Sequence, residues 1–271
     1  MPLAHGATFI GDFSGLAPAT EVPPFDGDPL AGYNNWSQSV ANPTGESGGY
    51  LAWGLTVANS NGFGLGVPYA APPTSAPFYV SHAVGMDLIA TVGHPVTTLQ
   101  TSFVVVDSLE YPDRNDYSIG FYGAGNSLLF GLDIMATSQV DVPGGPNDLW
   151  NIRWSSGNDS SDAFGAVIED FPGSPALYNL NVTFTTINVT DVQFNLSISG
   201  SNTFTTSGIL SGVNLAAASI AEYRVTASQG SGADWGDGFI GIAGLSVVPE
   251  PSAAILLGLS ALGLTRRRRS A

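Results

Sequence analysis

Residues 178–187 read Tyr-Asn-Leu-Asn-Val-Thr-Phe-Thr-Thr-Ile, and residues 191–199 read Asp-Val-Gln-Phe-Asn-Leu-Ser-Ile-Ser. In both stretches hydrophobic and polar residues alternate with a period of two, which places one set on each face of a pleated strand. Leu180, Val182 and Phe184 share the hydrophobic face of the first stretch, whereas Asn and Thr occupy the other face. Because only residues 188–190 separate the two stretches, they predict an antiparallel hairpin with one buried face.

The rest of the body follows the same pattern. Turn clusters rich in Gly, Asn, Asp and Pro separate further strand candidates, at residues 7–13, 50–58, 86–91, 99–107, 117–123, 128–135, 150–154, 163–169, 202–209, 222–226 and 239–248. No segment before the C-terminal tail has a helical period. We therefore predict an all-β fold, a two-sheet antiparallel β-sandwich. Residues 14–48 and 59–77 are rich in Pro and Gly, and we interpret them as long surface loops of a single domain.

The composition excludes several classes of function. The chain has no cysteine, so disulfides and thiol chemistry play no part. It carries 22 Asp and Glu against 7 basic residues, and only Arg114, Arg153 and Arg224 lie upstream of the C-terminal tail. A general nucleic-acid binder needs clustered cations on its folded body to neutralise phosphates, so that class is excluded.

The C-terminal tail combines three elements in order. Residues 248–251 are Val248, Pro249, Glu250 and Pro251, and the two prolines favour an extended, presentable segment over a helix. Residues 253–264 form an apolar run with no charge. Four arginines follow directly: Arg266, Arg267, Arg268 and Arg269.

We expect the apolar run to form a short transmembrane helix. At about 1.5 Å per residue it reaches roughly 20 Å, less than the ~30 Å hydrocarbon core, so the bilayer has to thin or the arginines have to snorkel. The arginines should stay on the cytoplasmic side, which places the acidic body on the opposite side. A buried C-terminal helix is the alternative, although such a helix normally has one apolar face rather than apolar residues all round.

The tail resembles the PEP-CTERM sorting signal of Gram-negative-type bacteria, in which Val-Pro-Glu-Pro-Ser precedes a short transmembrane segment and an arginine cluster. The resemblance covers residues 248–269 and implies that the chain is a substrate of an exosortase, an integral-membrane processing enzyme. It further implies that residues 249–251 carry recognition and that residues 266–269 set topology. We expect domains at 7–247 for the sandwich and 248–271 for the signal. Residues 1–6 would be the remnant of a signal peptide, since 4–6 have the small residues that precede a cleavage site.

The body resembles concanavalin A-like jelly rolls of the laminin G and legume-lectin type. The resemblance rests on residues 9–14, residues 118–122 and a last strand at 238–248 that should pair near the first strand. A glycosidase of this fold would need two carboxylates at its site, whereas the strand 131–135 offers Asp133 without a glutamate. We predict no catalytic residues and no enzymatic activity.

We expect residues that bind a ligand to lie in loops. Trp36 and Trp235 are candidates for stacking on sugar rings, because Trp53, Trp150 and Trp154 lie in strand patterns and are expected to pack in the core. Calcium is the ion that would suit the turns at 158–162 and 234–238, where Asp159, Asp162, Asp234 and Asp237 offer oxygen ligands. Ordinary Asx-turns are the alternative interpretation of the same residues.

These expectations define an exported protein. Its tail would anchor it transiently in the inner membrane with a cytoplasmic C-terminus before it reaches the cell surface or extracellular matrix. The resemblance implies a structural or adhesive role in exopolysaccharide or biofilm. A carbohydrate-binding, lectin-like module is the alternative, and a glycoside hydrolase is a third class that the residues favour less.

Overall fold

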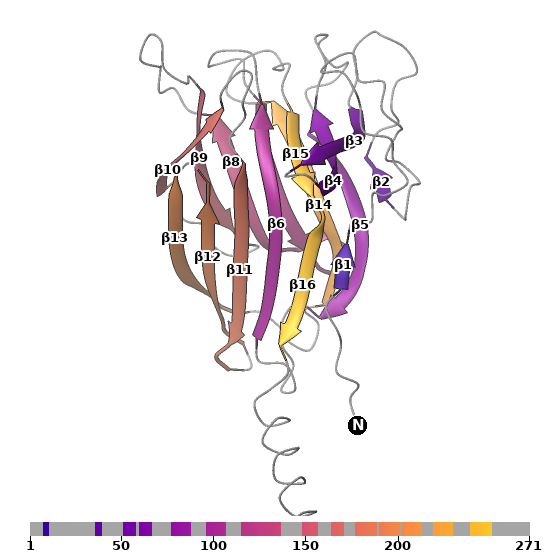
Figure 1. Ribbon diagram of the computed structural model, residues 1–271. Helices are drawn as coiled ribbons and strands as arrows, with labels where there is room; N and C mark the ends of the chain where they lie inside the picture. The colour runs from indigo at the N-terminus through magenta and orange to yellow at the C-terminus, as the bar shows by residue number, and fades with distance from the viewer. Residues whose placement is uncertain are drawn as a thin grey trace, which may run out of the picture.

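The computed structural model describes the strands and several of their connections. These are residues 8–10, 36–39, 51–57, 60–66, 77–87, 96–106, 115–136, 148–156, 164–170, 177–188, 190–200, 202–212, 219–229 and 239–250. Within them the chain forms two antiparallel sheets that pack face to face, as Figure 1 shows. The predicted two-sheet β-sandwich is confirmed.

The first sheet has nine strands. Its main path, in spatial order, consists of β13 (Thr203–Leu210), β12 (Val192–Ser199), β11 (Tyr178–Thr186), β6 (Val96–Val106), β15 (Phe239–Ala243), β4 (Ser60–Gly66) and β3 (Leu51–Val57). Two more strands lie off this path, because β16 (Leu245–Glu250) pairs with both β6 and β1 (Thr8–Ile10).

The second sheet has seven strands. Their spatial order is β10 (Phe164–Asp170), β9 (Asp148–Ser155), β8 (Leu128–Ala136), β7 (Asn115–Tyr122), β14 (Ser219–Gln229), β5 (Phe78–Asp87) and β2 (Trp36–Gln38).

The hairpin predicted from the alternating stretches is confirmed. β11 and β12 pair antiparallel, with Val182 opposite Leu196 and Phe184 opposite Phe194. All four of these side chains are buried, whereas the polar residues between them face away from the core. The period-two pattern therefore sets both the strand and the face that it buries.

The core lies between the sheets and is rich in aromatic side chains. Phe130 of the seven-stranded sheet contacts Phe184 and Phe194 of the nine-stranded sheet, with ring centroids 5.2 and 5.3 Å apart. Trp154 lies 4.8 Å from Phe194, and Trp150 is buried completely. The expected core roles of Trp150 and Trp154 are confirmed, while the side chain of Trp53 lies outside the described set.

The first and last strands pair as predicted. Thr8 lies opposite Val247, and Ile10 lies opposite Leu245. The stretch expected as one strand at 239–248 is divided at Gly244 into β15 and β16, which pair with different parts of β6. At the break, the buried Thr101 hydroxyl donates a hydrogen bond of 3.0 Å to the carbonyl of Ala243.

The expected long loops prove wrong where the structure describes them. Residues 60–66 form β4, in which Phe63 and Leu65 are buried while the alternate positions are glycines. Residues 36–38 form β2 at the edge of the other sheet. The strand predicted at 86–91 is instead the end of β5, which begins at Phe78; residues 88–91 lie outside the described part. Glycine has low strand propensity, so the alternating glycines of β4 gave this segment the composition of a loop.

Replacement of the buried Tyr223 by Phe is expected to stabilise the protein. Tyr223 lies in the core against Phe121 and Trp36, and its hydroxyl has no hydrogen-bond partner among the described residues. Because an unpaired buried hydroxyl costs free energy, Tyr223→Phe should raise the free energy of unfolding by about 1 kcal/mol and the Tm by roughly 2–4 °C. Thermal unfolding followed by tryptophan emission measures the change.

The same substitution should alter the alkaline limb of stability. Burial raises the pKa of Tyr223 well above its ordinary value of 10.0. Below pH 10 both states keep the proton, but above it the unfolded chain loses the proton first, so stability falls as the pH rises. Tyr223→Phe should reduce this fall, and an unchanged alkaline slope would contradict the assignment.

Candidate functional site

The sorting segment begins inside the sandwich. Val248, Pro249 and Glu250 form the end of β16, and they pair with Thr98, Thr97 and Val96 of β6. Val247 immediately before them is completely buried. The domain boundary expected after residue 247 therefore falls within a strand, since the backbone of the sheet continues through Glu250. Pro251 and the arginines at 266–269 lie outside the described residues.

The expected transmembrane helix also falls outside the part of the chain that the structure describes. Among the described residues, no helix has both the length and the apolar character needed to cross a membrane.

Trp36 does not present its ring to a ligand. The side chain is 2% exposed, with its ring 4.8 Å from Phe63 and 5.2 Å from His82. It bridges the edge strand β2 to the opposite sheet, so the prediction of a sugar-stacking role is corrected to a core role. An edge strand of three residues gives no sequence signal of this burial.

The remaining predicted ligand residues cannot be placed. Trp235, Asp159, Asp162, Asp234 and Asp237 all lie outside the described residues. Within the described residues, no three His, Asp or Glu side chains are grouped so that they could hold a metal ion. The calcium site stays a prediction.

The outer face of the seven-stranded sheet contains an arginine held between two tyrosines. The guanidinium carbon of Arg224 on β14 lies 3.9 Å from the ring centroid of Tyr79 on β5 and 4.1 Å from that of Tyr122 on β7. Both rings are partly exposed. Such cation–π contacts fix the guanidinium and both rings relative to one another. We call Tyr79, Tyr122 and Arg224 the tyrosine–arginine cluster.

Polar partners complete the surroundings of Arg224. Its Nε donates a hydrogen bond of 2.9 Å to Glu222, and its Nη2 donates one of 3.0 Å to the side-chain oxygen of Asn126. Asn126 lies in the tight β7–β8 connection and has a positive φ of 63°, a conformation that asparagine tolerates better than most residues. The connection thus brings an amide group over the sheet to the cluster.

The ring of Tyr122 lies over the backbone of Gly120. A Cβ at Gly120 would be only 2.8 Å from Cε2 of that ring. Gly120 lies opposite Arg224 on one side and opposite Gly131 on the other. Because neither glycine has a side chain, the centre of this face has room for the Tyr122 ring, which lies over the backbone there.

A row of outward-facing residues runs beside the cluster. Tyr79 lies opposite Thr226, which lies opposite Ser118; Ser118 in turn lies opposite Asp133, which lies opposite Arg153. The row crosses five neighbouring strands, about 19 Å at ~4.8 Å per strand. Arg153 closes it with an ion pair, its Nη2 being 3.0 Å from Asp133. This face therefore offers aromatic rings, hydroxyls and paired charges along one line.

The two described arginines on this face are each paired with a carboxylate, Arg224 with Glu222 and Arg153 with Asp133. Partial burial raises the pKa of Tyr122, while the positive charge of Arg224 opposes that shift. The phenol therefore stays protonated at neutral pH and can donate a hydrogen bond.

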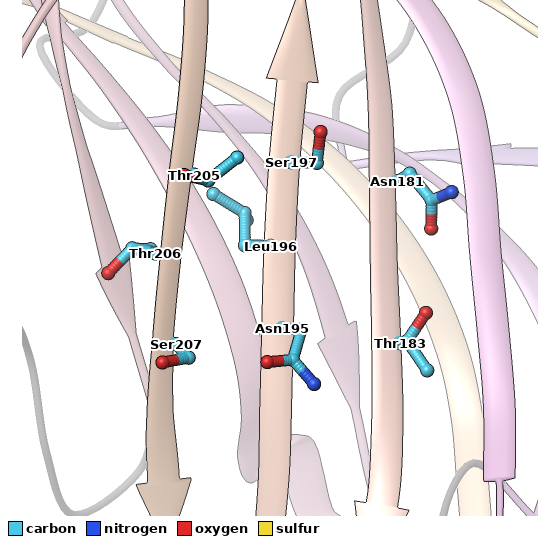
Figure 2. Close-up of a pocket in the computed structure, with 8 residues that line it drawn as sticks. All are labelled: Asn181, Thr183, Asn195, Leu196, Ser197, Thr205, Thr206 and Ser207. Atoms are coloured by element: carbon cyan, nitrogen blue, oxygen red, sulfur yellow. The ribbon is translucent and has the colours of Figure 1, made fainter.

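The described outer face of β11, β12 and β13 is polar and uncharged over most of its length. Figure 2 shows its shallow groove over β11, β12 and β13, which is lined by Asn181, Thr183, Asn195, Leu196, Ser197, Thr205, Thr206 and Ser207. The side chains are short, and none of them is aromatic or ionised. The groove supplies hydrogen-bonding groups without a ring on which a sugar could stack.

The chain carries a known sorting motif. Residues 247–269 match the PEP-CTERM protein-sorting motif. The resemblance found in the tail is thereby confirmed. The motif implies export, transit through a membrane-anchored state and processing by an exosortase. No curated protein matches the chain.

Solved structures resemble the body. The carbohydrate esterase of the Shiga toxin-encoding bacteriophage phi24B is 14% identical, with a TM-score of 0.50, covering 80% of this chain and 91% of that one. The Lotus tetragonolobus seed lectin is 12% identical, with a TM-score of 0.38 and coverage of 77% and 96%. The Emp47p carbohydrate recognition domain is 16% identical, with a TM-score of 0.41 and coverage of 88% and 99%. At these identities the likeness concerns the fold alone.

Fold and tail together define the class: an antiparallel β-sandwich whose last strand continues into a PEP-CTERM sorting motif. The sequence had already indicated both parts. It did not indicate the tyrosine–arginine cluster, whose members lie on three different strands; the one available signal was that residues 222 and 224 alternate with the buried Tyr223.

Proposed function

We propose that this chain is a cell-surface or extracellular-matrix protein with a structural or adhesive role in exopolysaccharide or biofilm. The observation that carries the proposal is the sorting motif at 247–269, which begins within the last strand of a folded sandwich. In this proposal residues 253–264 hold the chain in the inner membrane during transit, and residues 266–269 stay cytoplasmic. An exosortase then processes the segment around residues 249–251.

A lectin-like contact with polysaccharide is favoured by the tyrosine–arginine cluster. Aromatic rings offer a flat surface for the apolar side of a sugar, and the neighbouring amide, carboxylate and hydroxyl groups fit its hydroxyls. The two described arginines on this face are each paired with a carboxylate, and the chain as a whole has a formal net charge of -15. A neutral polysaccharide therefore suits the face, whereas an acidic one would be repelled.

We assign the sandwich no catalytic role. Asp133, the one acid of the strand at 131–135, accepts two hydrogen bonds of 3.0 and 3.1 Å from Arg153. Its neighbours along the row are Ser118 and Arg153, and the next outward carboxylate on β7, Asp116, accepts a hydrogen bond of 2.6 Å from the backbone N–H of Ala136. Retaining and inverting glycosidases need two carboxyl groups that act on the substrate, and protein groups already hold both of these carboxylates, so we propose binding without turnover.

Co-sedimentation with polysaccharide tests the binding role. The full chain in mild detergent is expected to pellet with neutral β-glucan particles and not with insoluble polygalacturonate. Tyr122→Ala should weaken glucan binding at least fivefold, because the substitution removes the central ring and leaves Arg224 stacked on one side only. Asn195→Ala on the opposite sheet is the matched control and should bind like the wild type. Equal binding by wild type and Tyr122→Ala would remove the cluster from the proposal.

A further inference from the structure

We propose that one end of the sandwich rests against the lipid bilayer while the tail is attached. This exit end consists of the end of β16 at Glu250, the β11–β12 turn with Ile187, and the end of β13 with Ile209. The partner is the membrane surface from which residues 253–264 emerge. The inference rests on the proposed function, because it needs the apolar run to be inserted in that membrane.

Strand register places the three parts at one end. Glu250 lies opposite Val96, and Val96 lies opposite Thr185. Thr185 lies opposite Gln193, which lies opposite Ile209. These residues form one row across neighbouring strands, about 19 Å from end to end at ~4.8 Å per strand. Ile187 lies just past the end of β11, beyond this row, and Figure 1 shows β11 and β16 ending on the same side of the molecule.

The described large hydrophobic side chains that are exposed both lie at this end. Ile187 is 51% exposed and Ile209 is 53% exposed. Over the rest of β11, β12 and β13, the outward-facing residues are polar: Asn179, Asn181, Thr183, Thr185, Gln193, Asn195, Ser197, Ser199, Thr203, Thr205 and Ser207. The outer face is thus polar along its length and gains isoleucines only where β16 leaves the sheet.

The turn presents Ile187 in a fixed position. The backbone N–H of Ile187 donates a hydrogen bond of 3.0 Å to the carbonyl of Asp191. The side-chain oxygen of Asn188 accepts hydrogen bonds from the backbone N–H groups of Thr190, at 2.8 Å, and of Asp191, at 2.9 Å. These hydrogen bonds fix the backbone of the turn, which leaves the Ile187 side chain 51% exposed. A lipid surface would cover this side chain.

The length of chain after β16 fixes where the membrane lies. Only Pro251 and Ser252 separate Glu250 from the start of the apolar run at Ala253. At no more than ~3.5 Å per residue, three steps span about 10 Å. The exit end therefore cannot move far from the bilayer as long as the run is inserted. The partly exposed carboxylate of Asp191 lies at the exit end, so zwitterionic lipids suit this end better than anionic ones.

Single-cysteine labelling tests the inference cleanly, because the chain contains no cysteine. The full chain with Ile187→Cys or Ile209→Cys would carry an environment-sensitive fluorophore and be reconstituted from detergent into phosphatidylcholine vesicles. The control is Thr203→Cys at the other end of β13, an exposed position about 20 Å away along the strand. Lipids with nitroxide-bearing acyl chains serve as quenchers.

Quenching at positions 187 and 209 is expected to be at least twofold stronger than at position 203. Equal quenching at all three positions, in protein that floats with the vesicles, would overturn the inference and leave the proposed membrane anchor intact. Protein that does not float with the vesicles would overturn both. A second arm with one-third phosphatidylglycerol should lower the quenching at position 187, and stronger quenching there would contradict the choice of lipid.

Discussion

In its native host the protein is expected to accumulate without its arginine block, and intact-mass spectrometry of the surface fraction should show this. The shortened chain should end at or after Glu250. The reason is structural, because the pairing of β16 with β6 extends through Glu250. A cut before Pro249 would remove the pairs with Thr97 and Val96, whereas a cut after Glu250 leaves all the pairs between β16 and β6 in place.

Replacement of the four terminal arginines should have the largest effect on this outcome. With Arg266, Arg267, Arg268 and Arg269 all changed to Ser, the apolar run loses its cytoplasmic charges and nothing fixes its orientation. We expect the processed form at the cell surface to fall at least tenfold. Replacement of the same four residues by Lys keeps the charge and is the matched control, which should process within about twofold of the wild type. Normal processing of the serine variant would show that the block does not set topology.

The sequence predicted the parts of the fold that depend on one strand at a time. The alternation at 178–187 and 191–199 was enough for the hairpin β11–β12, because the hydrophobic set must face one core. The pairing of the last strand with the first was expected from the resemblance to jelly rolls and not from the residues of either strand alone. The strand at 60–66 was not predicted, because glycines alternate with its buried residues and such a stretch has the composition of a loop.

The candidate site could not be predicted from the sequence, because it depends on strand order. Tyr79, Tyr122 and Arg224 are far apart in the chain and meet only because β14 lies between β5 and β7. The prediction for Trp36 failed for the same reason. The loop-like composition around it indicated an exposed ring, but Trp36 lies in the three-residue edge strand β2 and its ring packs in the core. The local sequence pattern predicts which face of a strand is buried. Which strands lie beside it can be known only from the strand order of the sheet.

The other large effect is expected in the aromatic contact between the sheets. Phe130 is 1% exposed and has ring contacts with Phe184 and Phe194, so it joins β8 to both strands of the hairpin. Phe130→Ala removes the ring and leaves a cavity, which should lower the free energy of unfolding by about 3–5 kcal/mol and the Tm by about 6–20 °C. Thermal unfolding of the full chain in mild detergent, followed by tryptophan emission, measures the change.

A double-mutant cycle separates the ring contact from burial alone. Phe184→Ala and the double variant Phe130→Ala/Phe184→Ala should give a coupling of about 0.5–1.5 kcal/mol, because the two rings are 5.2 Å apart and nearly perpendicular at 82°. Asn195→Ala, next to Phe194 but facing outward, is the control and should change stability by less than about 0.5 kcal/mol. Since a native domain is stable by only about 5–15 kcal/mol, a loss of about 3–5 kcal/mol from Phe130 would take roughly a fifth or more of the total. A Phe130→Ala variant as stable as the Asn195→Ala variant would mean that the two sheets do not pack through this contact.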